Sequence, residues 1–85
     1  MEAKDIEALL QAELDLSEVH VKSEGSHAEI IAVGDIFEAL SRVKKQQLIY
    51  KPLNQVIADG SLHAVSIKAF TPSEWQREKK LIMPS

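Results

Sequence analysis

The chain contains no cysteine, and this absence removes several classes of function at once. A disulfide framework, a thiolate nucleophile and a metal site built on the chain's own sulfur atoms are all excluded. Any metal chemistry must therefore use histidine, carboxylates or ligands supplied by a partner.

Glycine is also scarce, with three residues in 85, and no glycine-rich phosphate loop is present. The sequence likewise lacks the HExxH and GxSxG motifs and a convincing pair of catalytic carboxylates. It therefore carries no enzyme signature, and we expect a protein that is not an enzyme.

Long apolar runs are missing as well, since none approaches the roughly 18 residues that a membrane-spanning helix needs. The acidic start, Met1 to Glu7, has neither the basic nor the apolar region of a signal peptide. These two absences predict a cytoplasmic protein.

What is present is an ordinary globular composition, with 45% hydrophobic and 27% charged residues in 85. This length predicts a single domain over residues 1–85. The last residues, Leu81 to Ser85, are expected to fray, as chain ends commonly do.

The net charge of −3 hides an asymmetry between the two halves of the chain. Residues 1–38 hold ten acids and two bases, whereas residues 39–85 hold three acids and eight bases, which gives charges of −8 and +5. Such polarity favours a protein that orients on a charged partner, unless packing interleaves the two halves.

Hydrophobic periodicity and turn chemistry predict an α-β-β-α-α-β-α order of elements. This order indicates an α+β fold, a three-stranded sheet with helices packed on one face. The expected elements are a helix over residues 3–14, an antiparallel hairpin with strands near 19–22 and 27–33, a short helical piece over 35–40, a helix over 42–58, a strand over 62–70 and a final helix after Thr71.

Several details follow from the same patterns. Gly25 is free to take a positive φ in the hairpin turn, and Ser41 can cap the long helix. Thr71 begins a cap-and-proline sequence before the last helix. In the long helix, four residues are predicted to form one apolar side: Val43, Tyr50, Leu53 and Ile57.

The residues that could carry chemistry are the three histidines. His63 opens the third predicted strand, on the face shared by Val65 and Ile67, and is open to two interpretations: a hydrogen-bonded structural residue, or a ligand or proton carrier. His27 leaves the hairpin turn and is either a plain surface residue or a ligand. His20 alternates with two valines and is expected to face water. A role for His63 as general acid or base lacks a second catalytic group.

Basic residues cluster at the start of the long helix, where Arg42, Lys44 and Lys45 occur in a stretch, residues 39–58, that holds no acid. Nucleic-acid binding is one interpretation. The other is a solvated helix face that flanks an apolar stripe. At about 100° per residue, Lys44 lies away from Arg42 and Lys45, so the basic surface is not a single stripe.

Three segments of the sequence resemble the BolA family, specifically its IbaG-like branch, and the resemblance extends over about residues 3–80. The last segment is the most specific, because a His-Ala strand followed by Thr-Pro-x-x-Trp is a recognisable ending of that family. The segments are HAEIIAVGDIF at 27–37, SRVKKQQ at 41–47 and HAVSIKAFTPSEW at 63–75.

The resemblance implies a class II KH-like fold with a mixed sheet, in agreement with the predicted order of elements. It also implies an adaptor that binds a monothiol glutaredoxin and shares a 2Fe-2S cluster with it and with glutathione, for cluster trafficking or for iron or stress sensing. The family's C-terminal histidine corresponds to His63. The second ligand in the family is a His or Cys in the loop between the first two strands, and His27 is the nearest candidate here.

Two functions are therefore carried forward. The first is the adaptor, a monomer when alone and a heterodimer with its partner, which Arg42, Lys44 and Lys45 would steer electrostatically. The second is a nucleic-acid-binding transcriptional regulator that uses the basic helix 42–58, since the resemblance also implies DNA-linked regulation in some family members. The GxxG loop with which KH domains clamp nucleic-acid backbone is absent from this chain.

Overall fold

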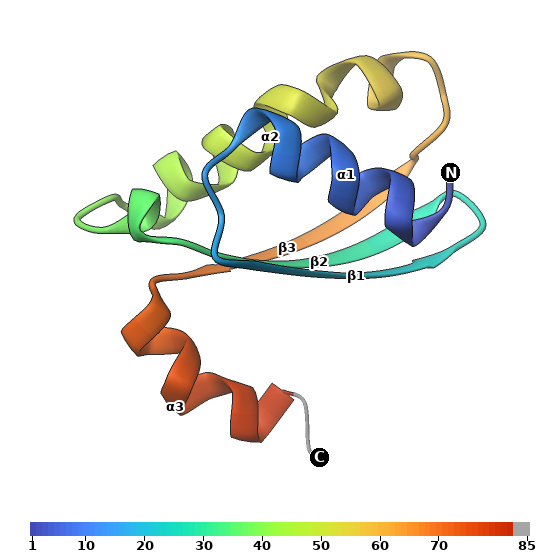
Figure 1. Cartoon of the computed structure of the whole chain (residues 1–85). Helices are drawn as coiled ribbons and strands as arrows, with labels where there is room; N and C mark the ends of the chain where they lie inside the picture. The colour runs from blue at the N-terminus through green and yellow to red at the C-terminus, as the bar shows by residue number, and fades with distance from the viewer. Residues whose placement is uncertain (83–85) are drawn as a thin grey trace.

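The computed structural model describes residues 1–82, and its elements follow the predicted α-β-β-α-α-β-α order (Figure 1). Residues 83–85, the end of the tail expected to fray, lie outside the described residues, whereas Leu81 and Ile82 belong to the last helix. The elements are α1 (Ala3–Glu13), β1 (Glu18–Glu24), β2 (His27–Val33), the short 3-10 helix η1 (Asp35–Phe37), α2 (Arg42–Ala58), β3 (Ala64–Phe70) and α3 (Pro72–Ile82).

The sheet has the order β1-β2-β3 and is mixed, as the resemblance implied. β1 and β2 form the predicted antiparallel hairpin, and Gly25 takes a φ of 61° in its turn. β3 joins β2 in parallel, with Ala64 opposite His27 and Phe70 opposite Val33. β2 is thus the central strand, and β1 and β3 form the two edges.

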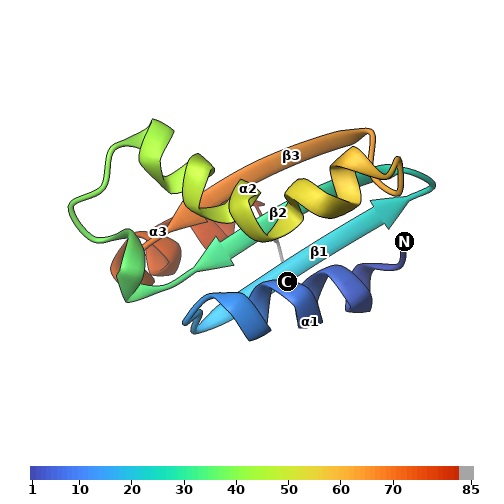
Figure 2. The same ribbon diagram turned by 90° about the horizontal axis from the view of Figure 1, so that it is seen from above.

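The main core lies between the sheet and two helices, α1 and α2, which cover one face of it (Figures 1 and 2). Alternate residues of β2 supply the sheet side of this core, because successive side chains of a strand point to opposite faces. The fully buried residues of the cluster include Ile6, Leu10, Ala28, Ala32, Phe37, Ile49, Leu53 and Leu62.

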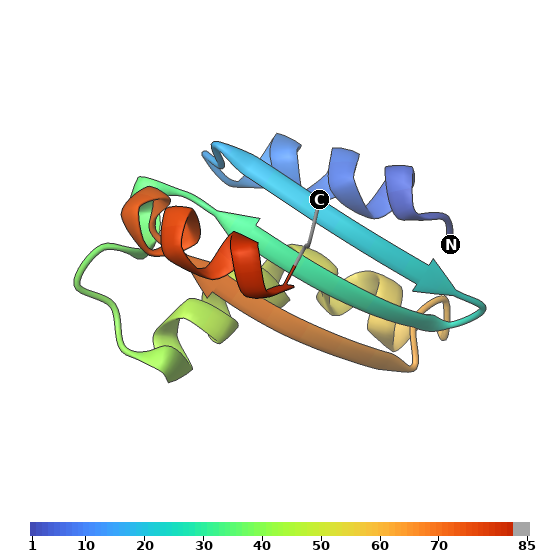
Figure 3. The same cartoon turned by 90° about the horizontal axis from the view of Figure 1, so that it is seen from below.

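The third helix departs from the expected arrangement, because α3 lies on the opposite face of the sheet (Figure 3). Trp75 of α3 is only 2% exposed, and its ring centroid lies 5.5 Å from both His20 of β1 and Phe70 of β3. The expectation of helices on one face therefore holds for α1 and α2. It fails for α3 because Phe70 and His20 present an aromatic surface on the other face.

Two side chains are placed differently from the sequence-based predictions. His20 does not simply face water, since α3 covers it and its side chain is 35% exposed. Val43, predicted on the apolar side of α2, is 64% exposed. The buried residues of α2 are Ile49 and Leu53, so its first turn lies outside the core.

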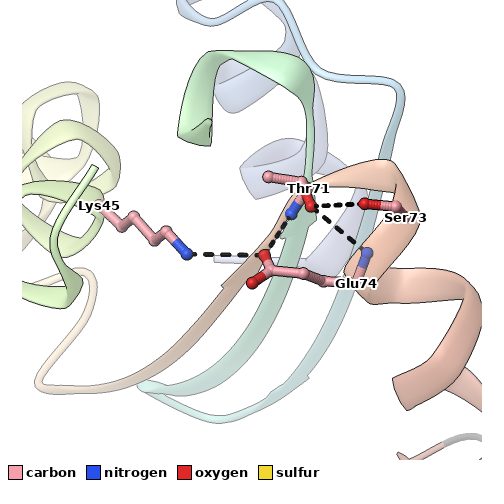
Figure 4. A network of polar contacts seen from close by, with 4 residues as sticks. All are labelled: Lys45, Thr71, Ser73 and Glu74. Atoms are coloured by element: carbon pink, nitrogen blue, oxygen red, sulfur yellow. Dashed lines mark hydrogen bonds and ion pairs between the residues drawn. The ribbon is translucent and has the colours of Figure 1, made fainter. Parts of the chain in front are cut away.

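The caps of the two long C-terminal helices are formed as predicted. Ser41 Oγ accepts a hydrogen bond from the backbone N–H of Lys44, at 3.2 Å. At α3, Thr71 Oγ1 accepts from the N–H of Glu74 at 3.3 Å, and Glu74 Oε1 accepts from the N–H of Thr71 at 2.8 Å (Figure 4). This reciprocal pair is a capping box, which satisfies two backbone donors that a helix start otherwise leaves unpaired.

Thr71→Ala should lower the free energy of unfolding by about 1 kcal/mol, because it removes the oxygen that caps α3. Urea unfolding followed by circular dichroism measures this change. Thr71→Ser keeps the hydroxyl and is the matched control, which should retain most of the stability. Equal losses in the two variants would show that the threonine methyl group, and not the cap, carries the effect.

Candidate functional site

The histidines His27 and His63 come together at one end of the sheet. The backbone N–H of His63 donates to the C=O of Ser26 at 2.9 Å, and the parallel register of β2 and β3 begins with the pair of His27 and Ala64. The structure therefore places the two predicted ligand residues at the starts of neighbouring strands, one register position apart. His63 precedes β3, which begins at Ala64 and not at residue 62 as predicted.

The side chains of these histidines lie on different faces of the sheet. Ala28 is buried in the core under α1 and α2, so strand alternation directs His27 toward the face that carries α3. The ring of His63 lies beside the end of α2, with Cε1 and Nε2 at 3.9 and 4.0 Å from the position that a Cβ of residue 60 would occupy. A metal ligated by both residues would have to lie beyond the end of the sheet.

The loop between α2 and β3 determines where His63 is presented. Gly60 has a φ of 85°, a left-handed conformation that glycine adopts without strain. Hydrogen bonding to the side chain of Ser61, and secondarily to its backbone N–H at 2.9 Å, lowers the pKa of Asp59 below its usual 3.8. Leu62 is fully buried and anchors the loop, so that the adjacent His63 is exposed.

The described chain offers few metal ligands in one place. Within residues 1–82, no group of three or more His, Cys, Asp or Glu side chains is placed to hold a metal ion. His63 is exposed, and an exposed imidazole can act as a single ligand in a site that a second protein completes. The donor set therefore fits a shared cluster and does not fit a cluster bound by this chain alone.

The predicted basic residues lie at the other end of α2 and β3. α2 has 17 residues and is about 25 Å long, with Arg42 and Lys44 exposed in its first turn and His63 beyond its last. Lys45 contacts α3, because its Nζ lies 3.6 Å from Glu74 Oε1 and its side chain is 18% exposed (Figure 4). The structure thus separates this basic group from His63 and gives Lys45 a structural contact.

The charge asymmetry along the sequence survives folding. The acidic half of the chain includes α1 and β1, which lie at one edge of the molecule (Figure 2). The basic half forms α2, β3 and α3, and β3 is the opposite edge of the sheet. The two halves meet where β2 pairs with β3 and where Trp75 of α3 packs on His20 of β1, but the two edges of the sheet belong to different halves, so a charged partner would meet them with different signs.

Sequence reasoning did not identify Lys68 and Glu78, which line a groove beside β3 together with Arg42 and Lys45. For Lys68 the sequence did contain a signal: successive side chains of a strand alternate between the two faces, so Lys68, which follows the core residue Ile67, points away from the core. For Glu78 no signal existed, because the sequence did not reveal on which face α3 packs.

Stability near the α2–α3 contact should depend on pH through Glu74. The N–H of Thr71, and secondarily Lys45, lower the pKa of Glu74 below its ordinary 4.5. A carboxylate with a lowered folded-state pKa stabilises the fold above its unfolded-state pKa, and this contribution disappears as the pH falls through the folded-state pKa. Glu74→Gln should therefore be less stable than the wild type at pH 7, and the difference should shrink below pH 4.5. Urea titrations at several pH values would contradict this if the difference stayed constant.

Comparison with known proteins places these features in a family. The family described as BolA-like protein matches residues 7–74 of the chain. Acid stress protein IbaG of Escherichia coli (strain K12) is 56% identical over 81 residues, which cover 95% of this chain and 96% of IbaG.

Solved structures agree with this assignment. BolA1 from Arabidopsis thaliana superposes with a TM-score of 0.75 at 31% identity, covering 87% of this chain and 98% of BolA1. The BolA domain of SufE1 from the same plant gives a TM-score of 0.76 at 35% identity, with 85% and 93% covered. No helix in the described residues has the length and apolar character needed to cross a membrane. The chain, with its mixed three-stranded sheet and its exposed histidine before β3, belongs to the BolA-like protein family.

Proposed function

We propose that this protein is a non-enzymatic adaptor that binds a cluster-loaded monothiol glutaredoxin and ligates the 2Fe-2S cluster through His63. The observation that carries the proposal is the exposed imidazole of His63, held at the end of the sheet by a loop with a buried anchor at Leu62. Membership of the BolA-like family supports it. The cluster is cargo, shared between two proteins.

The ligand count supports a shared site. A 2Fe-2S cluster takes four protein or thiol ligands, and a chain without cysteine cannot supply the sulfur ligands. In the proposal, the glutaredoxin cysteine and glutathione provide the thiolates, and His63 provides an imidazole nitrogen. His27 is the nearest second imidazole, although its side chain starts from the other face of the sheet.

Size-exclusion chromatography with iron analysis tests this proposal. The protein is mixed with a 2Fe-2S-loaded monothiol glutaredoxin, and the wild type is expected to elute as an iron-containing heterodimer. With His63→Ala, that iron-containing peak should be lost. An iron-containing heterodimer that forms equally with the variant would contradict ligation by His63.

The second candidate function, DNA binding, is favoured by one observation, the exposed Arg42 and Lys44 in the first turn of α2. Binding through phosphate contacts weakens steeply as salt rises. If the protein regulates through DNA, it should bind duplex DNA in a salt-dependent way, and this binding should collapse in an Arg42→Gln, Lys44→Gln variant. Lys4→Gln, which removes an exposed charge from α1, is the control. Absence of binding at low salt would eliminate this function.

A further inference from the structure

The outer edge of β3 is a free edge of the sheet. β2 pairs with β3 on one side only, and within residues 1–82 no strand pairs with the other side. By contrast, α1 lies alongside β1 (Figure 2). Exposed edges are sites at which another chain can add a strand, and proteins usually protect them with proline, charge or a covering element.

The backbone groups that would receive such a strand can be identified. The C=O of Phe70 accepts from the N–H of Gly34 at 3.0 Å, so the backbone of Phe70 faces β2. Because backbone groups alternate in direction along a strand, the N–H and C=O of Val65, Ile67 and Ala69 face outward. These residues have neither proline nor charge among them.

A groove of about 420 Å³ runs along the C-terminal half of this edge and is lined by residues of α2, β3 and α3. Its floor is formed by residues 67–70. α2 contributes Arg42 and Lys45 to one wall, and α3 contributes Glu74 and Glu78 to the other. The two walls therefore carry opposite charge.

The contact of Lys45 with Glu74 defines where the groove ends. Glu74 Oε1 also accepts from the N–H of Thr71 at 2.8 Å, so the ion pair lies just past the last residue of β3. Arg42 and Glu78 are in no ion pair with any described residue. These two side chains, one on each wall, are available to a ligand, and so is that of Lys68 in the floor, which is also in no ion pair with a described residue.

We propose that an extended segment of a partner protein binds in this groove as a fourth strand, hydrogen-bonded to the outward backbone groups of β3. α2 and α3 lie on opposite faces of the sheet, and alternate side chains of an added strand point to those two faces. The segment therefore carries an acidic side chain toward Arg42 and, on its other face, a basic side chain toward Glu78. Backbone bonds give such strand addition its affinity, and side-chain contacts give it specificity.

This surface is distinct from the proposed cluster site. His63 precedes the first residue of β3, whereas the groove accompanies residues 67–70. The strand site thus goes beyond the shared cluster and is testable with the isolated protein, without a glutaredoxin. A failure of one proposal leaves the other standing.

Two synthetic peptides of the same composition, both acetylated and amidated, test the proposal by NMR on the isotope-labelled full chain. In Thr-Glu-Val-Val-Lys-Thr the two charges fall on opposite faces of a strand, and in Thr-Glu-Val-Lys-Val-Thr they fall on one face. Only the first peptide is expected to shift the amides of Ile67 and Ala69, the outward-facing residues of the groove floor, and to slow their hydrogen exchange.

Variants of the charged residues on the two walls test whether the peptide binds in this groove. Arg42→Glu should weaken binding of the first peptide several-fold. Arg42→Glu combined with Glu78→Lys should restore it, because the peptide can then bind with its two faces exchanged, so that its lysine faces residue 42 and its glutamate faces residue 78. Unchanged amides with the first peptide, or equal effects of both peptides, would overturn the proposal. So would protection of the same amides that grows with protein concentration alone, since a second copy would then occupy the edge.

Discussion

Trp75→Ala is expected to lower the free energy of unfolding by about 3–5 kcal/mol, the range found for removing a large buried aromatic side chain. Trp75 is 2% exposed and is the only buried residue in the part of α3 whose side chains the structure describes, residues 72–81. Its ring packs against His20 and Phe70, each with a centroid separation of 5.5 Å. Without the indole, α3 keeps the capping box and the contact with Lys45, both at its first turn.

Urea unfolding followed by far-ultraviolet circular dichroism measures this loss, because the variant has no tryptophan fluorescence. Gln76→Ala changes the next, exposed residue of α3 and is the matched control, with an expected change within about 0.5 kcal/mol. For a small domain with a total stability of about 5–15 kcal/mol, the Trp75 loss is large. A loss below about 1 kcal/mol would mean that α3 is not anchored to the sheet through Trp75.

Local sequence signals predicted the elements well, because they act between near neighbours. Ser41 and Thr71 cap the helices that they were predicted to cap, and Gly25 takes the positive φ expected in the turn. Strand β2 occupies the predicted residues, His27–Val33. The two caps and the turn depend on contacts within about four residues, and the strand, which pairs with β1 and β3, was predicted from its local composition.

Features that depend on contacts between distant residues were predicted less accurately from the sequence. The covered state of His20 depends on Trp75, which lies 55 positions later in the chain, so alternation along β1 could not reveal it. Likewise, the periodicity of α2 placed Val43 on the core side, although the core begins only at Ile49. The exposure of both side chains depends on which elements pack over them in three dimensions, and local sequence patterns do not reveal this.

The candidate site was predicted in part. Parallel pairing of β2 with β3 brings His27 and His63 to one end of the sheet, which no spacing in the sequence indicated. The predicted ligand His63 lies beyond the last turn of α2, whereas the predicted basic residues Arg42, Lys44 and Lys45 lie at its start. That separation follows from helix length, since a helix of 17 residues cannot present both ends at one point.

His63→Ala should abolish the shared cluster while leaving the fold intact. The side chain is exposed and precedes β3, so its removal should change the free energy of unfolding by no more than about 0.5 kcal/mol. Loss of the imidazole removes the proposed ligand, and within residues 1–82 no group of three or more His, Cys, Asp or Glu side chains is placed to hold the metal instead. His20→Ala, which changes a histidine on the α3 side of the sheet, is the control for loss of an imidazole in general.

Visible circular dichroism of a 2Fe-2S-loaded monothiol glutaredoxin, titrated with this protein, tests the account most directly, since it reports the surroundings of the cluster. The wild type should produce a new spectrum that saturates near one equivalent, and His20→Ala should do the same. His63→Ala should leave the glutaredoxin spectrum unchanged. The same new spectrum with His63→Ala, or no change with the wild type, would contradict ligation of the cluster by His63.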